Sequence, residues 1–359
     1  MGEDQLGVPD PDVGRPIAIV GAGTIGVSWS IVFARGGRLV SLFDPDQGRR
    51  RLSKLEISHR LEALSDARLI DESRDVIADR VSVVDALSDS LDGACYVQEC
   101  ASEDLAVKRS LFATLDELAA ADAILASSSS AMRASEFASN LPGASRCLVV
   151  HPGNPPYLLP LVELVPGPFT HPAVVDRAEC LLASVGMSPI RVRREVEGFV
   201  FNRLQGAVLR EAYRLVEDGV VSPEDVDKVM REGLGRRWSI LGPFETAELN
   251  TRGGIEAHVR RLGAAYARMA SDHPPPGPLS DELVANVSKA VQVRFPRDQW
   301  DQHVEWRDRA LMLFEGVRRA NPLLNGPGEG ASGGHLHGEP ARGLVTEVDG
   351  SLPLGEGDS

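Results

Sequence analysis

The stretch from Pro16 to Asp44 restricts the fold of this chain more than any other. It reads as an apolar run, PIAIV, followed by the turn GAGTIG, a helical stretch that ends near Gly36, and a second apolar run, RLVSLF, that ends at Asp44. A strand, a glycine-rich turn, a helix, a second strand and an acid are the parts of the βαβ unit that binds a dinucleotide. The order of these parts therefore predicts a Rossmann-type nucleotide site.

The glycines of the turn have separate tasks in such a unit. The first permits a tight turn, the second lets the backbone approach a pyrophosphate, and the third lets the helix pack against the strand. Phosphates are favoured there because the free N–H groups and the dipole of a helix N-terminus attract anions. The residues predicted to hold the cofactor at this turn are Gly21, Gly23, Thr24, Ile25 and Gly26.

Asp44 indicates which dinucleotide is bound. It lies 18 residues after Gly26, at the end of the second predicted strand. A carboxylate there can accept hydrogen bonds from the adenosine ribose and would repel a 2′-phosphate, so NAD is favoured over NADP. Arg49, Arg50 and Arg51 leave a reservation, because one of these side chains could fold back toward the ribose.

The rest of the chain divides into two parts that differ in their patterns of apolar residues. Up to about residue 195, short apolar runs alternate with helical patterns, which favours a mostly parallel sheet covered on both faces. Beyond that point the patterns are helical. We expect an α/β fold with a Rossmann domain at 15–195, an all-α domain at 196–320, and disordered segments at 1–14 and 321–359. Further strands are predicted at 81–84, 94–99, 123–128, 147–150 and 189–193, and helices of the second domain at 197–219, 222–233, 252–270, 278–293 and 299–319.

A histidine and a glutamate stand on either side of a proline-rich turn. His151 ends the apolar run CLVV, and Glu163 is the one charge in a second run, LVELV. A buried carboxylate needs a partner, and His151 is the nearest candidate. Such a pair fixes the imidazole tautomer and lets the ring exchange a proton near neutral pH. The alternative is that His151 caps a strand and Glu163 binds backbone amides. Ser127–Ser130 follow a neighbouring strand and would lie at the same edge of the sheet.

Taken in order, these motifs resemble the L-3-hydroxyacyl-CoA dehydrogenase superfamily over about residues 16–320. The resemblance rests on the Rossmann unit, a serine, the sequence His-x-x-Asn-Pro, a glutamate, and a helix that opens with GFVFNR. It implies an oxidoreductase that uses NAD to interconvert a 3-hydroxy and a 3-keto group. The catalytic residues that it implies are Ser130, His151, Asn154, Glu163 and Asn202.

The resemblance also implies a role for each of these residues. His151 would take the proton of the substrate hydroxyl while Glu163 holds the imidazole. Ser130 and Asn202 would hydrogen-bond the reacting oxygen, and Asn154 would orient the ring or the substrate. Contacts on the nicotinamide side would fall on Glu103, Lys108 and Ser128, the last of which stands where the family usually has asparagine.

Within the superfamily, the segments HPGNPPYLLPLVELVPGP, ILGPFETAELN and WRDRALMLFEGVRR are similar to the lambda-crystallin, or L-gulonate 3-dehydrogenase, branch. Arg237 precedes the second of these segments, and a guanidinium suits a free carboxylate. A surface or interface arginine is the alternative. The expected substrate is a free 3-hydroxy acid such as L-gulonate. The alternatives are a 3-hydroxyacyl-CoA such as 3-hydroxybutyryl-CoA, a carnitine-type substrate, and a crystallin-like structural protein without turnover.

Composition narrows the possible partners. The net charge of −14 argues against nucleic acid and anionic membranes. No apolar run reaches about 18 residues, and the first residues lack the pattern of a signal peptide, so we expect no membrane span and a cytoplasmic protein. The four cysteines lack metal-ligand spacing and are expected to be buried thiols. His335 and His337 are expected in a solvated tail rather than a metal site. The wide apolar faces of the second half favour a homodimer through the helical domain.

Overall fold

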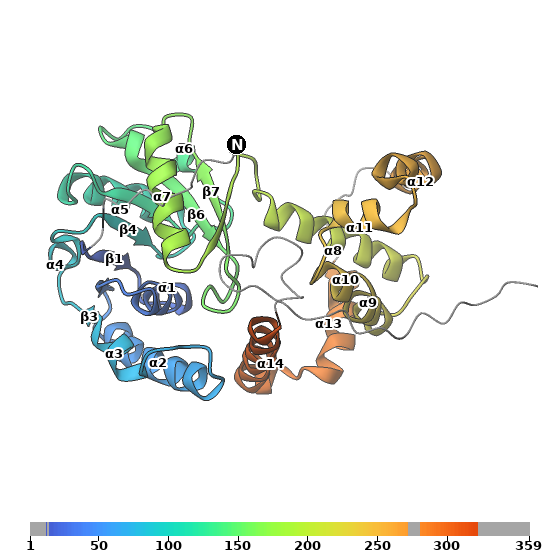
Figure 1. Ribbon diagram of the computed structural model, residues 1–359, viewed down its shortest axis with the longest axis horizontal. Helices are drawn as coiled ribbons and strands as arrows, with labels where there is room; N and C mark the ends of the chain where they lie inside the picture. The colour runs from blue at the N-terminus through green and yellow to red at the C-terminus, as the bar shows by residue number, and fades with distance from the viewer. Residues whose placement is uncertain (1–11, 13, 272–280, 322–359) are drawn as a thin grey trace, which may run out of the picture.

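The computed structural model describes residue 12, residues 14–271 and residues 281–321. It confirms the predicted fold class, because a mostly parallel sheet with helices on both faces precedes a helical domain (Figure 1). The boundary expected at 195/196 falls in the connection between the last strand and the first helix of the second domain. The predicted segments 1–14 and 321–359 lie almost entirely outside the described residues, and so do His335 and His337.

The sheet has eight strands in the order β3-β2-β1-β4-β5-β6-β7-β8. Only the β6–β7 pair is antiparallel, and the other neighbours run parallel. The glycine-rich turn after β1 and the serine cluster after β5 therefore lie at the same edge of the sheet, and His151 lies near that end of β6. The strands are β1 (Ile17–Val20), β2 (Val40–Phe43), β3 (Val81–Val83), β4 (Tyr96–Glu99), β5 (Ile124–Ser127), β6 (Cys147–Pro152), β7 (Leu161–Pro166) and β8 (Ser188–Arg191).

Two apolar clusters hold helices against the two faces of the sheet. Along β1, Ile17 and Ile19 enter one cluster and Ala18 and Val20 the other, as the two-residue period of a strand requires. The first cluster takes in α1 (Thr24–Arg35), α2 (Gln47–Asp66), α3 (Arg74–Asp79) and α7 (Pro172–Ser184). The second takes in α4 (Leu87–Leu91), α5 (Leu105–Leu118) and α6 (Ala134–Phe137).

The helical domain differs in detail from the predictions. The helix expected at 197–219 begins only at Phe201, after a turn in which Gly198 and Phe199 have positive φ. The helix expected at 222–233 is interrupted by a π-helical turn, and a helix at 243–250 had not been predicted. The elements are α8 (Phe201–Glu217), α9 (Pro223–Val229), η2 (Met230–Leu234), α10 (Gly235–Trp238), α11 (Pro243–Asn250), α12 (Gly254–Ser271), α13 (Asp281–Arg294) and α14 (Trp300–Ala320).

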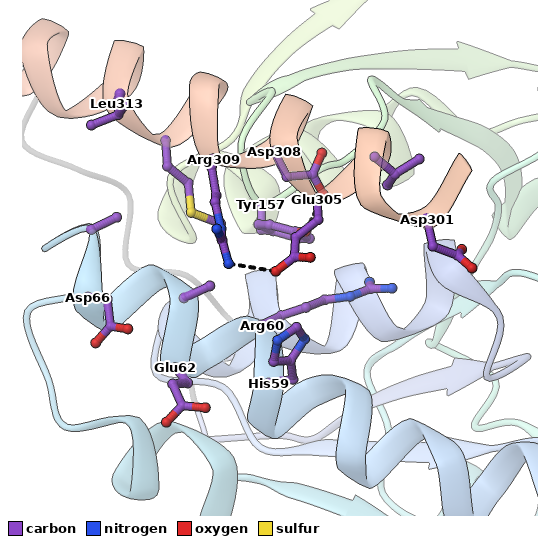
Figure 2. A pocket seen from close by; sticks show the side chains of 14 residues that line it. His59, Arg60, Glu62, Asp66, Tyr157, Asp301, Glu305, Asp308, Arg309 and Leu313 are labelled. Atoms are coloured by element: carbon purple, nitrogen blue, oxygen red, sulfur yellow. Dashed lines mark hydrogen bonds and ion pairs between the residues drawn. The ribbon is translucent and has the colours of Figure 1, made fainter. Parts of the chain in front are cut away.

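The last helix, α14, returns to the sheet domain and lies beside α2 (Figure 1). A cavity of about 750 Å³ separates the two helices, and Figure 2 shows charged side chains of both pointing into it. The Tyr157 hydroxyl donates to Asp308 of α14 at 3.2 Å, and Arg319 donates to the carbonyl of Leu69 at 3.1 Å. None of the predicted site residues lines this cavity, so it is not the expected crevice.

One expectation about the cysteines is wrong. Cys95 and Cys147 are buried and Cys100 is half-buried, but Cys180 is exposed. The helix α7 buries Val175, Ala178, Leu181 and Leu182, and Cys180 lies between these positions on the outer face. In the described part of the chain, no helix combines the length and the apolar character that crossing a membrane requires.

Candidate functional site

The glycine-rich turn after β1 has the geometry that a bound dinucleotide requires. Gly21 has φ +109°, and a Cβ there would lie 2.6 Å from the carbonyl oxygen of Cys100. A Cβ on Gly26 would lie 1.8 Å from the Gly21 oxygen, so helix and turn approach as closely as glycine allows. A Cβ on Gly23 would meet no protein atom within 4 Å. Packing therefore explains the first and third glycines, while the open side at Gly23 fits an approaching pyrophosphate.

Asp44 directly follows β2 and lies beside this turn. Its Oδ2 accepts from the Ala22 amide at 2.7 Å, and its Oδ1 accepts from the Asp46 amide at 2.9 Å. Arg49 folds back and donates to the Ala22 carbonyl at 2.9 Å, while Arg50 donates to the Asp44 carbonyl at 2.6 Å. Both arginines near the carboxylate thus bind backbone oxygens. A contact between this acid and the ribose of NAD stays a prediction.

His151 and Glu163 lie directly opposite each other in the antiparallel β6–β7 pair. The distance from His151 Nδ1 to Glu163 Oε2 is 2.8 Å, and the side chains are 5% and 1% exposed. No described residue hydrogen-bonds the other ring nitrogen, Nε2. This nitrogen is not enclosed by the protein either. One nitrogen is therefore held by a carboxylate and the other remains accessible to a ligand.

The second oxygen of Glu163 has partners in the helical domain. Glu163 Oε1 accepts from the amide of Val200 at 2.8 Å and from that of Phe201 at 3.0 Å. These amides stand at the N-terminus of α8, where unpaired N–H groups and the helix dipole favour an anion. Glu163 thus both contacts His151 and binds backbone amides, so the two readings of this residue that the sequence allowed are present together.

The serine loop after β5 is held by Glu103. This carboxylate accepts from the Ser129 hydroxyl at 2.8 Å and from the Ser130 amide at 2.7 Å. Asn202, in the first turn of α8, donates to the Ser130 carbonyl at 2.9 Å. The structure therefore brings Glu103, Ser130 and Asn202 into one chain of hydrogen bonds. Asn154 and Ser130 are exposed, and no described residue binds the Asn154 side chain or the Ser130 hydroxyl.

Ser128, which stands where the resemblance would place an asparagine, takes part in a network of side-chain contacts. Its hydroxyl contacts Trp29 Nε1 at 3.1 Å, Gln98 Nε2 at 2.7 Å and Cys100 Sγ at 3.3 Å. Burial raises the pKa of the Cys100 thiol to about 12, so this thiol stays protonated near neutral pH. Ser128 thereby links the ends of β4 and β5 to α1, and its contact with a cofactor stays a prediction.

Lys108 has an unexpected partner. Its Nζ lies 2.9 and 3.0 Å from the two oxygens of Glu99, and the two side chains are 1% and 0% exposed. The Ser127 hydroxyl also donates to Glu99, at 2.5 Å. The ammonium is enclosed in this pair, so any influence on a cofactor would pass through Glu99. A direct nicotinamide contact stays a prediction for Lys108, as it does for Glu103.

Comparison with known proteins decides the family. The model of the 3-hydroxyacyl-CoA dehydrogenase NAD binding domain matches residues 16–196, and that of the 3-hydroxyacyl-CoA dehydrogenase C-terminal domain matches residues 198–289. The chain belongs to the 3-hydroxyacyl-CoA dehydrogenase family. As a member of that family it is an NAD-dependent oxidoreductase that acts on a CH–OH group.

Its similarity to individual proteins extends over most of the chain. It is 41% identical to a lambda-crystallin homolog of Bos taurus, over 85% of this chain and 96% of that protein. It is 32% identical to an L-carnitine dehydrogenase of a Pseudomonas species, over 83% of this chain and 92% of that protein. The solved structure of 5-formyl-3-hydroxy-2-methylpyridine 4-carboxylic acid 5-dehydrogenase is similar with a TM-score of 0.74 and 27% identity, covering 87% and 99% of the two chains.

Within this dehydrogenase, Arg237 lies apart from the residues just described. It belongs to the short helix α10, all of which is exposed, and none of the contacts among the described residues joins it to His151 or Glu163. Its neighbour Arg236 pairs loosely with Glu232 at 3.7 Å on the surface. A role for Arg237 in substrate binding stays a prediction.

Sequence reasoning missed Glu99 as the partner of Lys108 and Ser127, and it did not identify Val200 and Phe201 as the source of the amides that Glu163 binds. The sequence did contain a signal for the Glu99–Lys108 pair. Lys108 stands four residues before Phe112 and seven before Leu115, so it occupies the buried stripe of α5. A lysine on an apolar stripe needs a buried anion. Among the described residues, no group of three or more histidine, cysteine or acidic side chains could hold a metal ion.

Proposed function

We propose that the chain oxidises a free 3-hydroxy acid to the 3-keto acid, and catalyses the reverse reaction, with the His151–Glu163 pair as the general base. The observation that carries the proposal is the imidazole held at 2.8 Å by a buried carboxylate through one nitrogen, with the other nitrogen accessible. A base must be oriented and must reach its proton, and this arrangement supplies both conditions. Bound NAD would supply the acceptor of the hydride.

The residues around the pair can share the work of the reaction. In the oxidative direction, His151 Nε2 takes the proton of the substrate hydroxyl, and Glu163 stabilises the charged imidazolium. The Ser130 hydroxyl stands free to donate to the substrate oxygen. Asn202 donates one N–H of its side-chain amide to the Ser130 carbonyl. Its other N–H, together with the start of α8, would face the same substrate oxygen. In the reductive direction these donors polarise the ketone while the imidazolium returns its proton. Asn154 is exposed, three residues after His151, and would orient the substrate.

A free acid is favoured as the substrate by the similar proteins. The carnitine dehydrogenase and the pyridine carboxylic acid dehydrogenase are named for substrates that are free acids. The resemblance to the lambda-crystallin branch points in the same direction, and to L-gulonate as the first substrate to try. Arg237 would bind the carboxylate, because a guanidinium offers two parallel N–H donors to it.

The test is NAD⁺ reduction followed at 340 nm with L-gulonate, 3-hydroxybutyrate, carnitine and 3-hydroxybutyryl-CoA in parallel. Turnover on a free acid supports the proposal. Arg237→Ala should then raise the KM for that acid about 10- to 100-fold, the effect of losing a charge-assisted pair, while Arg237→Lys keeps part of the affinity. Arg236→Ala, on the same exposed helix, is the matched control and should leave KM unchanged.

A second candidate function is oxidation of a 3-hydroxyacyl-CoA ester, since both domain models that match the chain come from dehydrogenases of that substrate class. Turnover on the CoA ester alone would favour it and would leave Arg237 without a role in binding. A crystallin-like protein without turnover is the non-enzymatic alternative. It would gain support if NAD failed to bind and none of the four substrates reacted.

A homodimer through the helical domain is part of the proposal. An apolar groove of about 530 Å³ runs between α8, α9 and η2, and Val220 and Val229, which line it, are each more than half exposed. Exposed apolar side chains that gather around one groove are typical of a protein interface. A second copy of the chain is the occupant that we propose, and sedimentation of the purified protein would show a single monomeric species if the proposal is wrong.

The cytoplasmic location also stays a proposal. It rests on the composition of the chain and on the cysteines, of which Cys95 and Cys147 are buried with their pKa raised to about 11 and about 12 by desolvation. Buried thiols of this kind persist where the compartment is reducing. Fractionation of cells that express the full chain would test the location, and recovery with a membrane or a secreted fraction would overturn it.

A further inference from the structure

The turn between β8 and α8 contains a rare backbone conformation. Gly198 has φ +72° and is followed by Phe199 with φ +49°. Among the described residues, Arg68 is the only other residue with a side chain whose φ is positive. A bulky side chain in the left-handed region is disfavoured, so the surrounding structure must hold Phe199 there.

This turn aims the start of α8 at the catalytic pair. The amides that follow it, of Val200 and Phe201, both donate to Glu163 Oε1, at 2.8 and 3.0 Å. The other oxygen, Oε2, contacts His151 Nδ1 at 2.8 Å. Glu163 is therefore shared between the imidazole and the positive end of a helix of 17 residues. The direction in which the backbone continues after Phe199 decides whether Glu163 can bind the two amides and His151 at the same time.

The ring of Phe199 supports the same pair from another side. Phe199 is fully buried within the apolar cluster formed by β-strands, α5 and α6. Its ring centroid lies 5.4 Å from that of His151, with the planes inclined at 56°, and the Phe201 ring stands edge-on at 6.4 Å. Two aromatic contacts and one carboxylate contact thus restrict the rotation of the imidazole.

We propose that Phe199 is a positioning residue for this dehydrogenase: its buried ring and left-handed backbone hold His151 and Glu163 in line and fasten the first turn of the helical domain to them. The inference rests on the proposed function, because it concerns the same proton-transfer pair. It also explains why Asn202, three residues further on, reaches the Ser130 carbonyl at 2.9 Å. One anchored turn sets the base, its carboxylate and the serine loop together.

The first test compares Phe199→Ala and Phe199→Leu with the same substitutions at Phe112. Phe112 belongs to the same apolar cluster and is equally buried at 0% exposure, and its described ring contact is with Phe137. Phe199→Ala should lower kcat on the order of 10- to 100-fold, the usual effect of a misplaced catalytic group, with NAD affinity within about twofold of the parent. Phe199→Leu keeps bulk in the cluster and should lose less.

The second test is a double-mutant cycle with Glu163→Gln, measured on kcat. If Phe199 acts through Glu163, Phe199→Leu should reduce turnover far less in the Glu163→Gln background than in the parent. Equal factors in both backgrounds would overturn the inference, and so would equal losses of kcat in the Phe112 and Phe199 variants. If instead His151→Ala and Glu163→Gln both keep parental turnover, the proposed function itself has failed, which these readouts distinguish.

Discussion

The sheet domain and the helical domain bury their residues to very different extents. In the sheet domain, α1 has 12 residues and buries the nine from Gly26 to Ala34. In the helical domain, α8 has 17 residues and buries none, and neither α9 nor α10 buries any. A helix on a sheet is covered by the fold itself, whereas the helices of the second domain leave wide apolar faces open. The proposed homodimer would account for this difference, because a second chain could cover the apolar faces that the helical domain leaves exposed.

The polar groups of the candidate site follow the same division. Glu99, Glu103 and Glu163 all find their partners within or next to the sheet domain. The helical domain reaches them only with the first turn of α8, through the amides on Glu163 and through Asn202. Buried charges require fixed partners, and the well-packed sheet domain supplies them. The sheet domain thus holds most of the candidate site, and the helical domain contacts it through the first turn of α8.

The same substitution in the two domains should have very different effects on stability. Lys108→Met leaves the buried Glu99 without its cation, which should lower the free energy of unfolding by roughly 3–5 kcal/mol. Lys228→Met removes an exposed charge from α9 and should change it by less than about 0.5 kcal/mol. Urea denaturation of both variants measures the contrast. Equal, small losses would mean that the Glu99–Lys108 pair is not the tightly held element described above.

A charge placed in the apolar groove tests whether the helical domain needs a partner. Val208→Asp puts a carboxylate in the groove between α8 and α9, and burying it under a second chain would cost several kcal/mol. Association should weaken by about a hundredfold or more, which sedimentation velocity would show as a monomer. Leu39→Asp changes an exposed apolar residue of the sheet domain and is the matched control. A dimer that survives Val208→Asp would place the interface elsewhere.

Asp44 supplies the smallest of the three effects, and it should be visible in cofactor binding. Asp44→Asn removes the charge but keeps a side chain of the same shape at the end of β2. Because a hydrogen bond to a charged group contributes about 1.5–3 kcal/mol, the Kd for NAD should rise about 10- to 100-fold, and NADP should compete better than in the parent. Fluorescence titration with both dinucleotides gives the answer. An unchanged preference would exclude Asp44 as the ribose ligand.

Local patterns in the sequence were sufficient to predict most of the sheet domain. The turn from Gly21 to Gly26 and the acid at Asp44 are set by short-range geometry that a sequence displays directly. His151 and Glu163 could be paired because a short proline-rich turn joins two strands, and the register places them opposite each other. The fold class followed from alternating patterns whose period reflects burial.

Contacts between distant segments were the part that could not be predicted. Glu163 binds amides 37 and 38 residues later in the chain, and no local pattern marks a backbone amide as a partner. Ser127 and Glu99 are 28 residues apart and meet only because β4 and β5 are neighbours. Exposure of Cys180 depended on which face of α7 meets the sheet, and its position beside apolar residues did not reveal that face.

The central claim is that His151 exchanges the proton of the substrate, and the turnover of His151→Ala tests it most directly. NAD affinity and kcat should be measured on one preparation, with the substrate identified in the four-compound assay. General acid–base help contributes about 10²–10⁴ in rate, so kcat should fall at least a hundredfold while the Kd for NAD stays unchanged. Turnover within about tenfold of the parent, with NAD still bound, would contradict the account.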